Sequence, residues 1–262
     1  FLLAPQSSVN LGGAEIVAYH NDHKTAAVIT GGSTLSLVSY RKGFKSPKVV
    51  AELELPGNAQ SVDINKDGLI AVAVAVNASN EGRIYFYQLN KNNEPVAKGS
   101  VAAGNLPDSL SFTPNGKTLV SANEGEPSKF YGTEDGVDPA GSISVVRLNE
   151  DKPGRSKVTT LDFASYDTDD LRNQGIRISG ENPNPLQDIE PEYVSISPNG
   201  RDAFITLQEN NAIARVDLNK RKIKDIFSQG LKDWTGTEVD TTDRDGVYAP
   251  GQRNFFGGHA LG

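Results

Sequence analysis

The stretch EPEYVSISPNGRDAFITLQENNAIARVDL, residues 190–218, decides the fold of this chain. Apolar and polar residues alternate around Val194 and Ile196, Asn199-Gly200 follows, and a second alternating run comes after it. A period of two is that of a strand with one packed face, and Asn-Gly tolerates the positive φ that a tight hairpin needs. These residues therefore predict an antiparallel hairpin, followed by a third strand in AIARVDL.

The same pattern occurs four times along the chain. LPDSLSFTPNGKTLVSANEGEP at residues 106–127 is a close copy, and two further copies begin with AEIVAYH at residue 14 and AQSVDIN at residue 59. Glu15, Gln60 and Asp108 occupy equivalent positions 45 and 48 residues apart. This spacing suits a propeller blade of roughly 40–50 residues. The repeat predicts an all-β fold, a β-propeller of about four four-stranded antiparallel blades.

We expect the four blades to form a single domain. Their predicted ranges are 12–56, 57–104, 105–163 and 190–228, with insertions at 123–141 and 164–189 and a tail at 229–262. A β-sandwich also has many short strands, but it does not explain this self-similarity. Because propellers more often have about six to eight blades, we expect the chain to belong to a larger ring, the alternative being an unusually small one.

The long loops of the predicted propeller fall on one side, which we call the upper rim. The innermost strand of each blade begins at this rim, and the loops after each second and fourth strand return to it. The turns between first and second strands are all short, whereas the upper connections at 123–141 and 164–189 are long. Within the second of these, DTDDLRNQG at 167–175 predicts a short capped helix. Long loops gathered on one rim favour a functional site there.

Carboxylates recur just ahead of the innermost strands. Glu15, Asp108 and Glu192 share one repeat position, and Gln60 holds it in the remaining blade. Converging carboxylates repel one another unless they are protonated, hydrogen-bonded or bridged by a cation. Oxygen ligands in this arrangement suit Ca²⁺, so we predict a calcium site at the channel mouth. The alternative is that each residue caps backbone N–H groups or is solvated.

Further candidate ligands lie in the upper loops. Glu124 and Glu126 follow the second strand of the third blade, and Asp243 and Asp245 begin a sequence like that of a calcium loop. An EF-hand would have a Glu where this chain has Asn254, and solvated acidic loops are the alternative for both groups. Three residues are candidates for binding a ligand at this rim: Gln60, Arg177 and Arg244. Surface ion pairs are the alternative for the two arginines.

Composition narrows the classes of function. The formal net charge of −7 argues against a nucleic-acid partner, and no apolar run is long enough to span a bilayer, so no transmembrane segment is expected. The absence of cysteine excludes disulfides and a thiolate nucleophile. The three histidines and the lack of a G-x-S-x-G motif give little support for nucleophilic catalysis. Asn77-Ala78-Ser79 is a candidate glycosylation site.

The sequence resembles one known family at GAEIVAY, LPDSLSFTPNGK, NEGEP, EPEYVSISPNG, LQENNA and DRDG. It is similar to the choice-of-anchor I group, which is related to the mesenchyme-specific cell-surface glycoproteins and includes proteins described as atypical alkaline phosphatases. The similarity runs from about residue 12 to residue 246, and the tail after it departs from the pattern. The resemblance implies a propeller that continues beyond this length and a secreted or cell-surface location, and it transfers no catalytic residue.

Three functional hypotheses follow. The first is a non-enzymatic extracellular propeller that binds Ca²⁺ and a surface or matrix protein through its upper rim. The second is a calcium-dependent phosphoester hydrolase, in which cations activate a water and Arg177 or Arg244 hold the phosphate. The third is a structural subunit of a larger surface assembly, with the remaining blades as partner.

Overall fold

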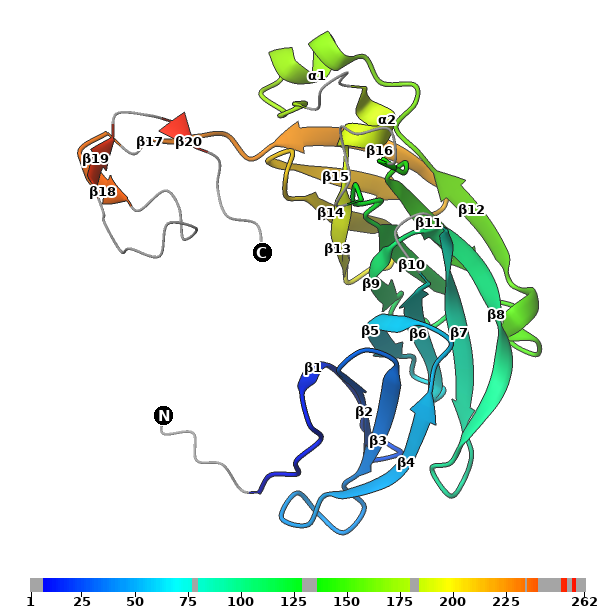
Figure 1. The fold of residues 1–262 in the computed structure, drawn as a ribbon. Helices are drawn as coiled ribbons and strands as arrows, with labels where there is room; N and C mark the ends of the chain where they lie inside the picture. Colours follow the sequence, from blue (N-terminus) through cyan, green and yellow to red (C-terminus); the bar gives the residue numbers. More distant parts are fainter. Residues whose placement is uncertain are drawn as a thin grey trace.

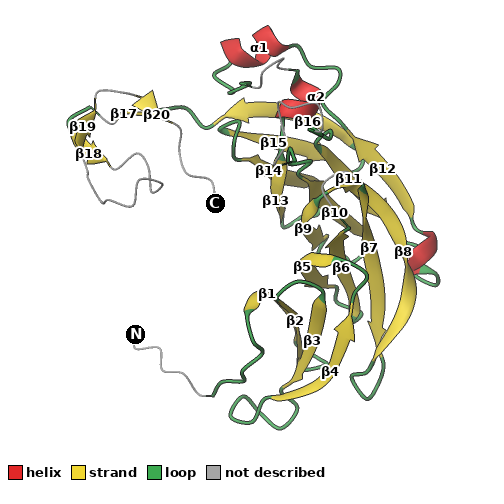
Figure 2. Ribbon diagram, in the orientation of Figure 1, coloured by secondary structure: helices red, strands yellow, loops and turns green. Residues whose placement is uncertain are grey.

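The computed structural model describes residues 7–76, 80–128, 136–179, 184–233, 235–239, 251–253 and 256–257. Its main body consists of four antiparallel sheets with four strands each, and every sheet keeps its strands in sequence order. Figure 2 shows an almost entirely β structure with a few short helical turns. The predicted fold class, four-stranded antiparallel propeller blades, is confirmed.

The sixteen strands of these sheets follow one another along the chain. Sheets one and two comprise β1 (Ala14–His20), β2 (Thr25–Thr30), β3 (Thr34–Ser39), β4 (Lys48–Glu54), β5 (Asn58–Ile64), β6 (Leu69–Ala75), β7 (Glu81–Leu89) and β8 (Pro95–Asn105). Sheets three and four comprise β9 (Pro107–Phe112), β10 (Thr118–Asn123), β11 (Ser142–Arg147), β12 (Lys157–Leu161), β13 (Pro191–Ile196), β14 (Asp202–Leu207), β15 (Ala212–Asp217) and β16 (Lys222–Ser228).

The turns between first and second strands have the geometry that the sequence predicts in three of the four sheets. Gly68, Gly116 and Gly200 all have φ between +67° and +77°, and the N–H of each donates to the carbonyl three residues earlier. A type I turn closed by a left-handed residue is a common tight hairpin, and glycine enters that region without steric cost. In the first sheet Lys24 takes the equivalent conformation, with φ of 48°.

The sheets stand side by side in an arc, with β1, β5, β9 and β13 along its concave side (Figure 1). Apolar clusters fill the spaces between neighbouring sheets, because alternate residues of each strand face opposite neighbours. Strands β2 and β6 are buried at every residue for this reason. The arc therefore has a continuous core between its sheets and leaves the inner strands to form its concave wall.

Short elements decorate the connections. Helix α1 (Thr168–Asn173) begins at Asp167, whose side chain accepts from the N–H groups of Asp169 and Asp170, so the predicted capped helix is confirmed. Helix α2 (Pro185–Asp188) lies in the same crossover, and a 3₁₀ turn, η1 (Pro153–Arg155), joins β11 to β12. After β16 come two small ladders, which pair β17 (Lys232–Asp233) with β20 (Phe256–Gly257) and β18 (Thr237–Val239) with β19 (Gly251–Arg253).

None of the helices in the described part of the chain has the length and apolar character that crossing a membrane requires.

Candidate active site

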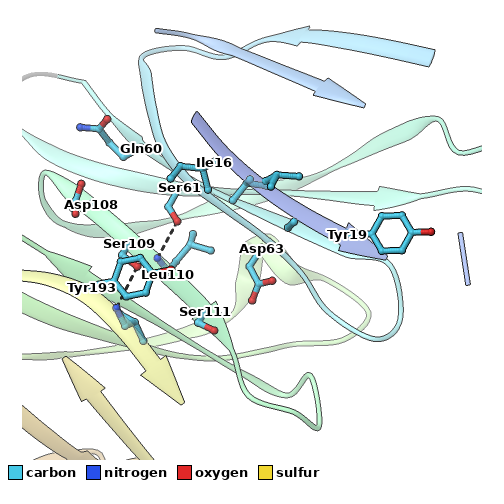
Figure 3. Close-up of a pocket in the computed structure, with 14 residues that line it drawn as sticks. Ile16, Tyr19, Gln60, Ser61, Asp63, Asp108, Ser109, Leu110, Ser111 and Tyr193 are labelled. Carbon is cyan, nitrogen blue, oxygen red and sulfur yellow. Dashed lines mark hydrogen bonds between the residues drawn. The ribbon is translucent and has the colours of Figure 1, made fainter. Parts of the chain in front are cut away.

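A hollow of about 290 Å³ opens on the concave wall of the arc. All four inner strands line it: Ile16 to Tyr19 of β1, Gln60 to Asp63 of β5, Asp108 to Ser111 of β9, and Tyr193 and Val194 of β13. Gln60 and Asp108 lie at one end of the hollow, and Tyr19 lies at the other (Figure 3). Its volume is at the small end of the range for ligand sites in proteins.

Polar side chains of one sheet hold the inner strand of the next. The Ser61 hydroxyl accepts from the N–H of Leu110 at 3.3 Å, and the Ser109 hydroxyl accepts from the N–H of Val194, also at 3.3 Å. These bonds satisfy backbone groups on the free edge of each inner strand, which has no strand partner on that side. The same hydroxyls line the hollow, so the contacts that set the spacing of the sheets also shape its wall.

Asp63 is a part-buried carboxylate in this wall. Burial raises the pKa of Asp63, although the N–H groups of Phe112 and Ile64 and the Ser111 hydroxyl bond to it and act in the opposite direction. The two N–H groups donate to separate Asp63 oxygens, both at 2.8 Å. Asp63 therefore connects the second sheet to the third while it keeps one face toward the hollow (Figure 3).

Carboxylates gather at the upper rim, next to the end of the hollow where Asp108 lies. Asp108 is the second residue of β9, Glu192 is the second residue of β13, and the others follow β10 or β14 or precede β13. We call these six residues the upper-rim carboxylates: Asp108, Glu124, Glu126, Glu190, Glu192 and Glu209. Asp108 is shared between this group and the hollow, so the two form one site.

Burial and mutual repulsion favour the protonated forms of Glu124 and Glu190. Burial, together with the charges of Asp108, Glu126, Glu190 and Glu209, raises the pKa of Glu124 to about 8. Burial and then the charge of Glu209 are the largest causes that raise the pKa of Glu190 to about 7. A carboxylic acid that is protonated at neutral pH can donate a proton in catalysis.

Glu192 and Glu209 form a hydrogen-bonded pair of carboxyl groups. Burial, this hydrogen bond and the charge of Glu209 raise the pKa of Glu192 well above its usual range. Two carboxyl groups can bond to each other only when one of them carries a proton. The Oε1 atom of Glu192 is buried and has no hydrogen-bond partner.

Asn210 anchors the loops that carry these carboxylates. Its side chain is 1% exposed, and its amide donates to the carbonyls of Arg177 and Asp188 at 2.9 and 2.7 Å. Its Oδ1 accepts from the N–H of Glu190 at 3.2 Å. The turn after β14, which carries Glu209, is therefore tied to the crossover that ends at Glu190.

Gly141 allows the third and fourth sheets to approach closely at the same rim. A Cβ atom at this position would lie 1.9 Å from the carbonyl oxygen of Ile189. Backbone cannot yield as the end of a flexible side chain can, so only glycine fits here without moving the crossover. The position of Glu190, directly after Ile189, depends on this contact.

The structure brings together four of the seven residues predicted as metal ligands: Asp108, Glu124, Glu126 and Glu192. Glu15 is exposed at the start of β1, two sheets away from β9, and its charge is not among those that raise the pKa values of the upper-rim carboxylates. Asp243 and Asp245 lie outside the described residues. Within the described ranges, no group of three or more acidic or histidine side chains could hold a metal ion as placed. The calcium site therefore stays a prediction.

The other predicted site residues are dispersed. Gln60 lines the hollow. Arg177 has an exposed side chain, and its backbone N–H donates to the Asn210 carbonyl at 2.9 Å. Arg244 and the candidate glycosylation site Asn77 lie outside the described residues. Their assigned roles remain predictions.

Four residues of the site were not identified from the sequence: Asp63, Glu190, Tyr193 and Glu209. Glu209 follows β14 at a distance of two residues and Glu124 directly follows β10, so the repeat places both in the connection after a second strand but one residue out of register. Asp63 and Tyr193 alternate with the apolar residues of their strands, and this alternation points them away from one core face. Glu190 had no such signal, because its place depends on the crossover.

Two histidines lie at the opposite, lower rim. His20 Nδ1 accepts from the N–H of His23 at 3.1 Å, and His20 Nε2 bonds to the carbonyl of Lys66, also at 3.1 Å. His23 Nδ1 bonds to Asn93 Oδ1 at 3.0 Å. These contacts join the first two sheets, which gives both residues a structural role away from the carboxylates.

The choice-of-anchor I domain matches residues 15–259 of this sequence. The chain belongs to the choice-of-anchor I domain family. The match to this domain extends past residue 246, so the expectation that the tail departs from the family pattern was wrong. No curated protein matches the chain. The relation to mesenchyme-specific glycoproteins and to atypical alkaline phosphatases stays a prediction.

Two solved structures of similar fold are lactonases by name. The periplasmic gluconolactonase of Pseudomonas aeruginosa superposes with a TM-score of 0.59 at 12% identity, over 92% of this chain and 66% of that chain. A candidate 6-phosphogluconolactonase from Bacteroides uniformis superposes with a TM-score of 0.54 at 11% identity, over 81% of this chain and 56% of that one. The chain thus spans about two thirds or less of the length of these structures.

These neighbours correct the first functional hypothesis. A non-enzymatic, calcium-binding surface propeller was expected, but the similar folds are named as enzymes that hydrolyse a lactone. The non-enzymatic part of this hypothesis was based on the lack of a nucleophile motif in the sequence, and such a lack does not bear on acid–base catalysis by carboxyl groups. Burial and mutual repulsion raise the pKa values of Glu124 and Glu190.

Proposed function

We propose that this choice-of-anchor I domain belongs to a hydrolase that opens lactones, with the upper-rim carboxylates as its acid and base. The observation that carries the proposal is the position of Asp108. This residue lines the hollow, and its charge also raises the pKa of Glu124. A carboxylate that faces a ligand site and lies close to a protonated carboxylic acid is the pairing that general acid–base catalysis uses.

The proposed reaction divides into two proton transfers. Asp108 takes a proton from a water as the water oxygen bonds to the lactone carbonyl carbon, which gives a tetrahedral intermediate. The intermediate then breaks the bond between this carbon and the ring oxygen, and Glu124 donates its proton to the departing oxygen. The product is an open-chain hydroxy acid, and the proton held by Asp108 returns to Glu124. The net reaction consumes one water.

The remaining upper-rim carboxylates act through Glu124. The charges of Glu190 and Glu209 help to raise the pKa of Glu124 to about 8, so Glu124 keeps its proton at neutral pH. We regard both as positioning residues because their charges act on the pKa of Glu124. The likeness of the fold to a gluconolactonase supports the choice of a lactone over other esters. The gluconolactonase of similar fold is described as periplasmic, and the chain belongs to the choice-of-anchor I family. Both observations support an extracellular or periplasmic location.

Hydrolysis of D-glucono-1,5-lactone tests this function. The assay follows acid release at constant pH and subtracts the spontaneous reaction. We expect turnover by the chain, and we expect Asp108→Asn to lower kcat by about 10²- to 10⁴-fold, the usual contribution of one general acid or base. Glu52→Gln, on the exposed side of β4, is the matched control and should keep full activity. Lack of turnover, or an Asp108→Asn variant as active as the parent, would contradict the proposal.

A further inference from the structure

We infer that the hollow binds an uncharged polyhydroxy group, so that the substrate is an unphosphorylated sugar-acid lactone. This inference rests on the proposed function and narrows its substrate class. The names of the two similar structures specify different lactones, gluconolactone without a phosphate and 6-phosphogluconolactone with one, and we expect the first for this chain.

The charged side chains in the wall of the hollow are acidic. Among the described residues that line the hollow there is no Lys or Arg, whereas Asp63 and Asp108 both lie there. Proteins bind phosphate groups with Arg, Lys, helix N-termini or a metal ion, and like charges in a site that is partly shielded from water repel strongly. A phosphorylated sugar would bring a negative charge of nearly two toward these carboxylates without a cation to meet it.

The wall of the hollow also contains side chains that can hydrogen-bond to a ligand. The Ser61 and Ser109 hydroxyls each accept one backbone N–H from the next sheet. A hydroxyl of this kind still has its own proton to donate. Gln60 adds an amide that can donate and accept at the same end as Asp108 (Figure 3). Mixed donors and acceptors with fixed positions match sugar hydroxyls, which also donate and accept.

Two tyrosines give the hollow an aromatic surface. Tyr193 is 62% exposed and Tyr19 is 42% exposed, although both rings belong to inner strands of the sheets. A tyrosine ring combines an apolar face with a polar tip, so it can cover the C–H face of a sugar ring while its hydroxyl contacts water or ligand. Tyr19 packs against Tyr40 and Phe44, so the more exposed Tyr193 is the ring that a ligand in the hollow would cover.

A pair of lactones tests the inference directly. Initial rates with D-glucono-1,5-lactone and with its 6-phosphate are compared on the 262-residue chain. We expect kcat/KM for the neutral lactone to exceed that for the phosphorylated one by at least tenfold. Gln60→Lys places a cation in the hollow and should reduce this ratio by raising kcat/KM for the phosphorylated lactone. Asn92→Lys adds the same charge on an exposed turn and should leave the ratio unchanged.

Binding provides a readout that is independent of turnover. Calorimetric titrations with D-glucose and with glucose 6-phosphate should show binding of the neutral sugar only, and Tyr193→Ala should weaken it at least fivefold. Hydrolysis of both lactones at equal rates, or preference for the phosphate, would overturn the inference while the proposed function stands. Binding of glucose that depends on Tyr193, without hydrolysis of any lactone, would support the hollow and overturn the proposed function. Neither binding nor hydrolysis would overturn both.

Discussion

Glu124 shows at the scale of one residue how the fold controls a proton. Its carboxyl group is part-buried beside β10, and the charges around it all have the same sign as its own. A pKa near 8 is the result, against an ordinary value near 4.5. Between these two values the folded chain binds a proton at Glu124 that the unfolded chain does not bind, so stability falls as pH rises through this window.

This linkage predicts a pH-dependent gain from Glu124→Gln. At pH 4.5 and below, Glu124 is protonated in both states, and the amide should behave like the neutral acid. Above pH 8 the buried charge destabilises the parent, and removing it should raise the free energy of unfolding by about 1–3 kcal/mol after allowance for partial solvent screening. Urea unfolding at pH 5 and pH 9 measures the difference. A variant no more stable than the parent at pH 9 would contradict the assigned cause.

The control for this experiment is Glu52→Gln on β4. Glu52 is exposed and lies on the outermost strand of the first sheet. Its substitution removes one negative charge without removing a buried one, so the stability difference from the parent should be within about 0.5 kcal/mol at both pH values. An equal gain in both variants would assign the effect to net charge.

At the scale of elements, the site depends on the crossover between β12 and β13. Asn210 binds this segment at three backbone groups, those of Arg177, Asp188 and Glu190. A buried amide with all of its partners in place keeps two loops in register, and removing it leaves buried polar groups unpaired. The crossover is therefore part of the site even though it contributes no residue to the hollow as described.

Asn210→Ala should destabilise the chain by about 2–4 kcal/mol, because three backbone groups lose their partner at once. The thermal midpoint of unfolding by circular dichroism measures the loss, and Asn92→Ala on an exposed turn is the control. The same variant should also lower lactone hydrolysis, since it releases Glu190 and Glu209 from their positions. Unchanged stability in Asn210→Ala would show that water replaces the amide, and the anchoring role would be wrong.

Strand order and turn positions could be predicted from the sequence because they depend on local chemistry. Period-two alternation and the Gly68, Gly116 and Gly200 turns each act within a few residues. Asp108 and Glu192 could also be predicted, since a repeated position in the sequence becomes a repeated position on the rim. Glu190 and Glu209 could not, because they meet only through the folded crossover and its contact with Asn210. Glu15 was grouped with Asp108 and Glu192 by repeat position, but two sheets separate β1 from β9 along the arc.

At the scale of the whole molecule, neighbouring sheets share their cores, and the outermost strand β4 is less buried in them than β2 and β6. Strands β2 and β6 are buried throughout and have strand partners on both edges, whereas exposed and part-buried residues alternate along β4. The concave wall stays open to solvent, and the expectation that further blades complete a larger ring stays a prediction. The span of the chain, 66% and 56% of the two similar structures, is compatible with it.

This arrangement predicts an order of hydrogen exchange. Amides of β2 and β6 should exchange last, because they open only when two cores are disrupted together. Amides of β4 should exchange at least tenfold faster, since one edge of this strand has no partner in its sheet. Exchange followed by mass spectrometry after digestion resolves these segments. Equal protection of β4 and β6 would contradict the description of the sheets as separate layers with shared cores.

The pH dependence of kcat for D-glucono-1,5-lactone, in the parent chain and in Glu124→Gln, tests the central claim most directly. If Glu124 donates the proton to the leaving oxygen, kcat should fall above about pH 8 as this group ionises. Glu124→Gln should have a kcat lower by about 10²-fold and should lose this alkaline decline. Profiles of the same shape and height in the two proteins would contradict the assignment of the upper-rim carboxylates as the catalytic acid and base.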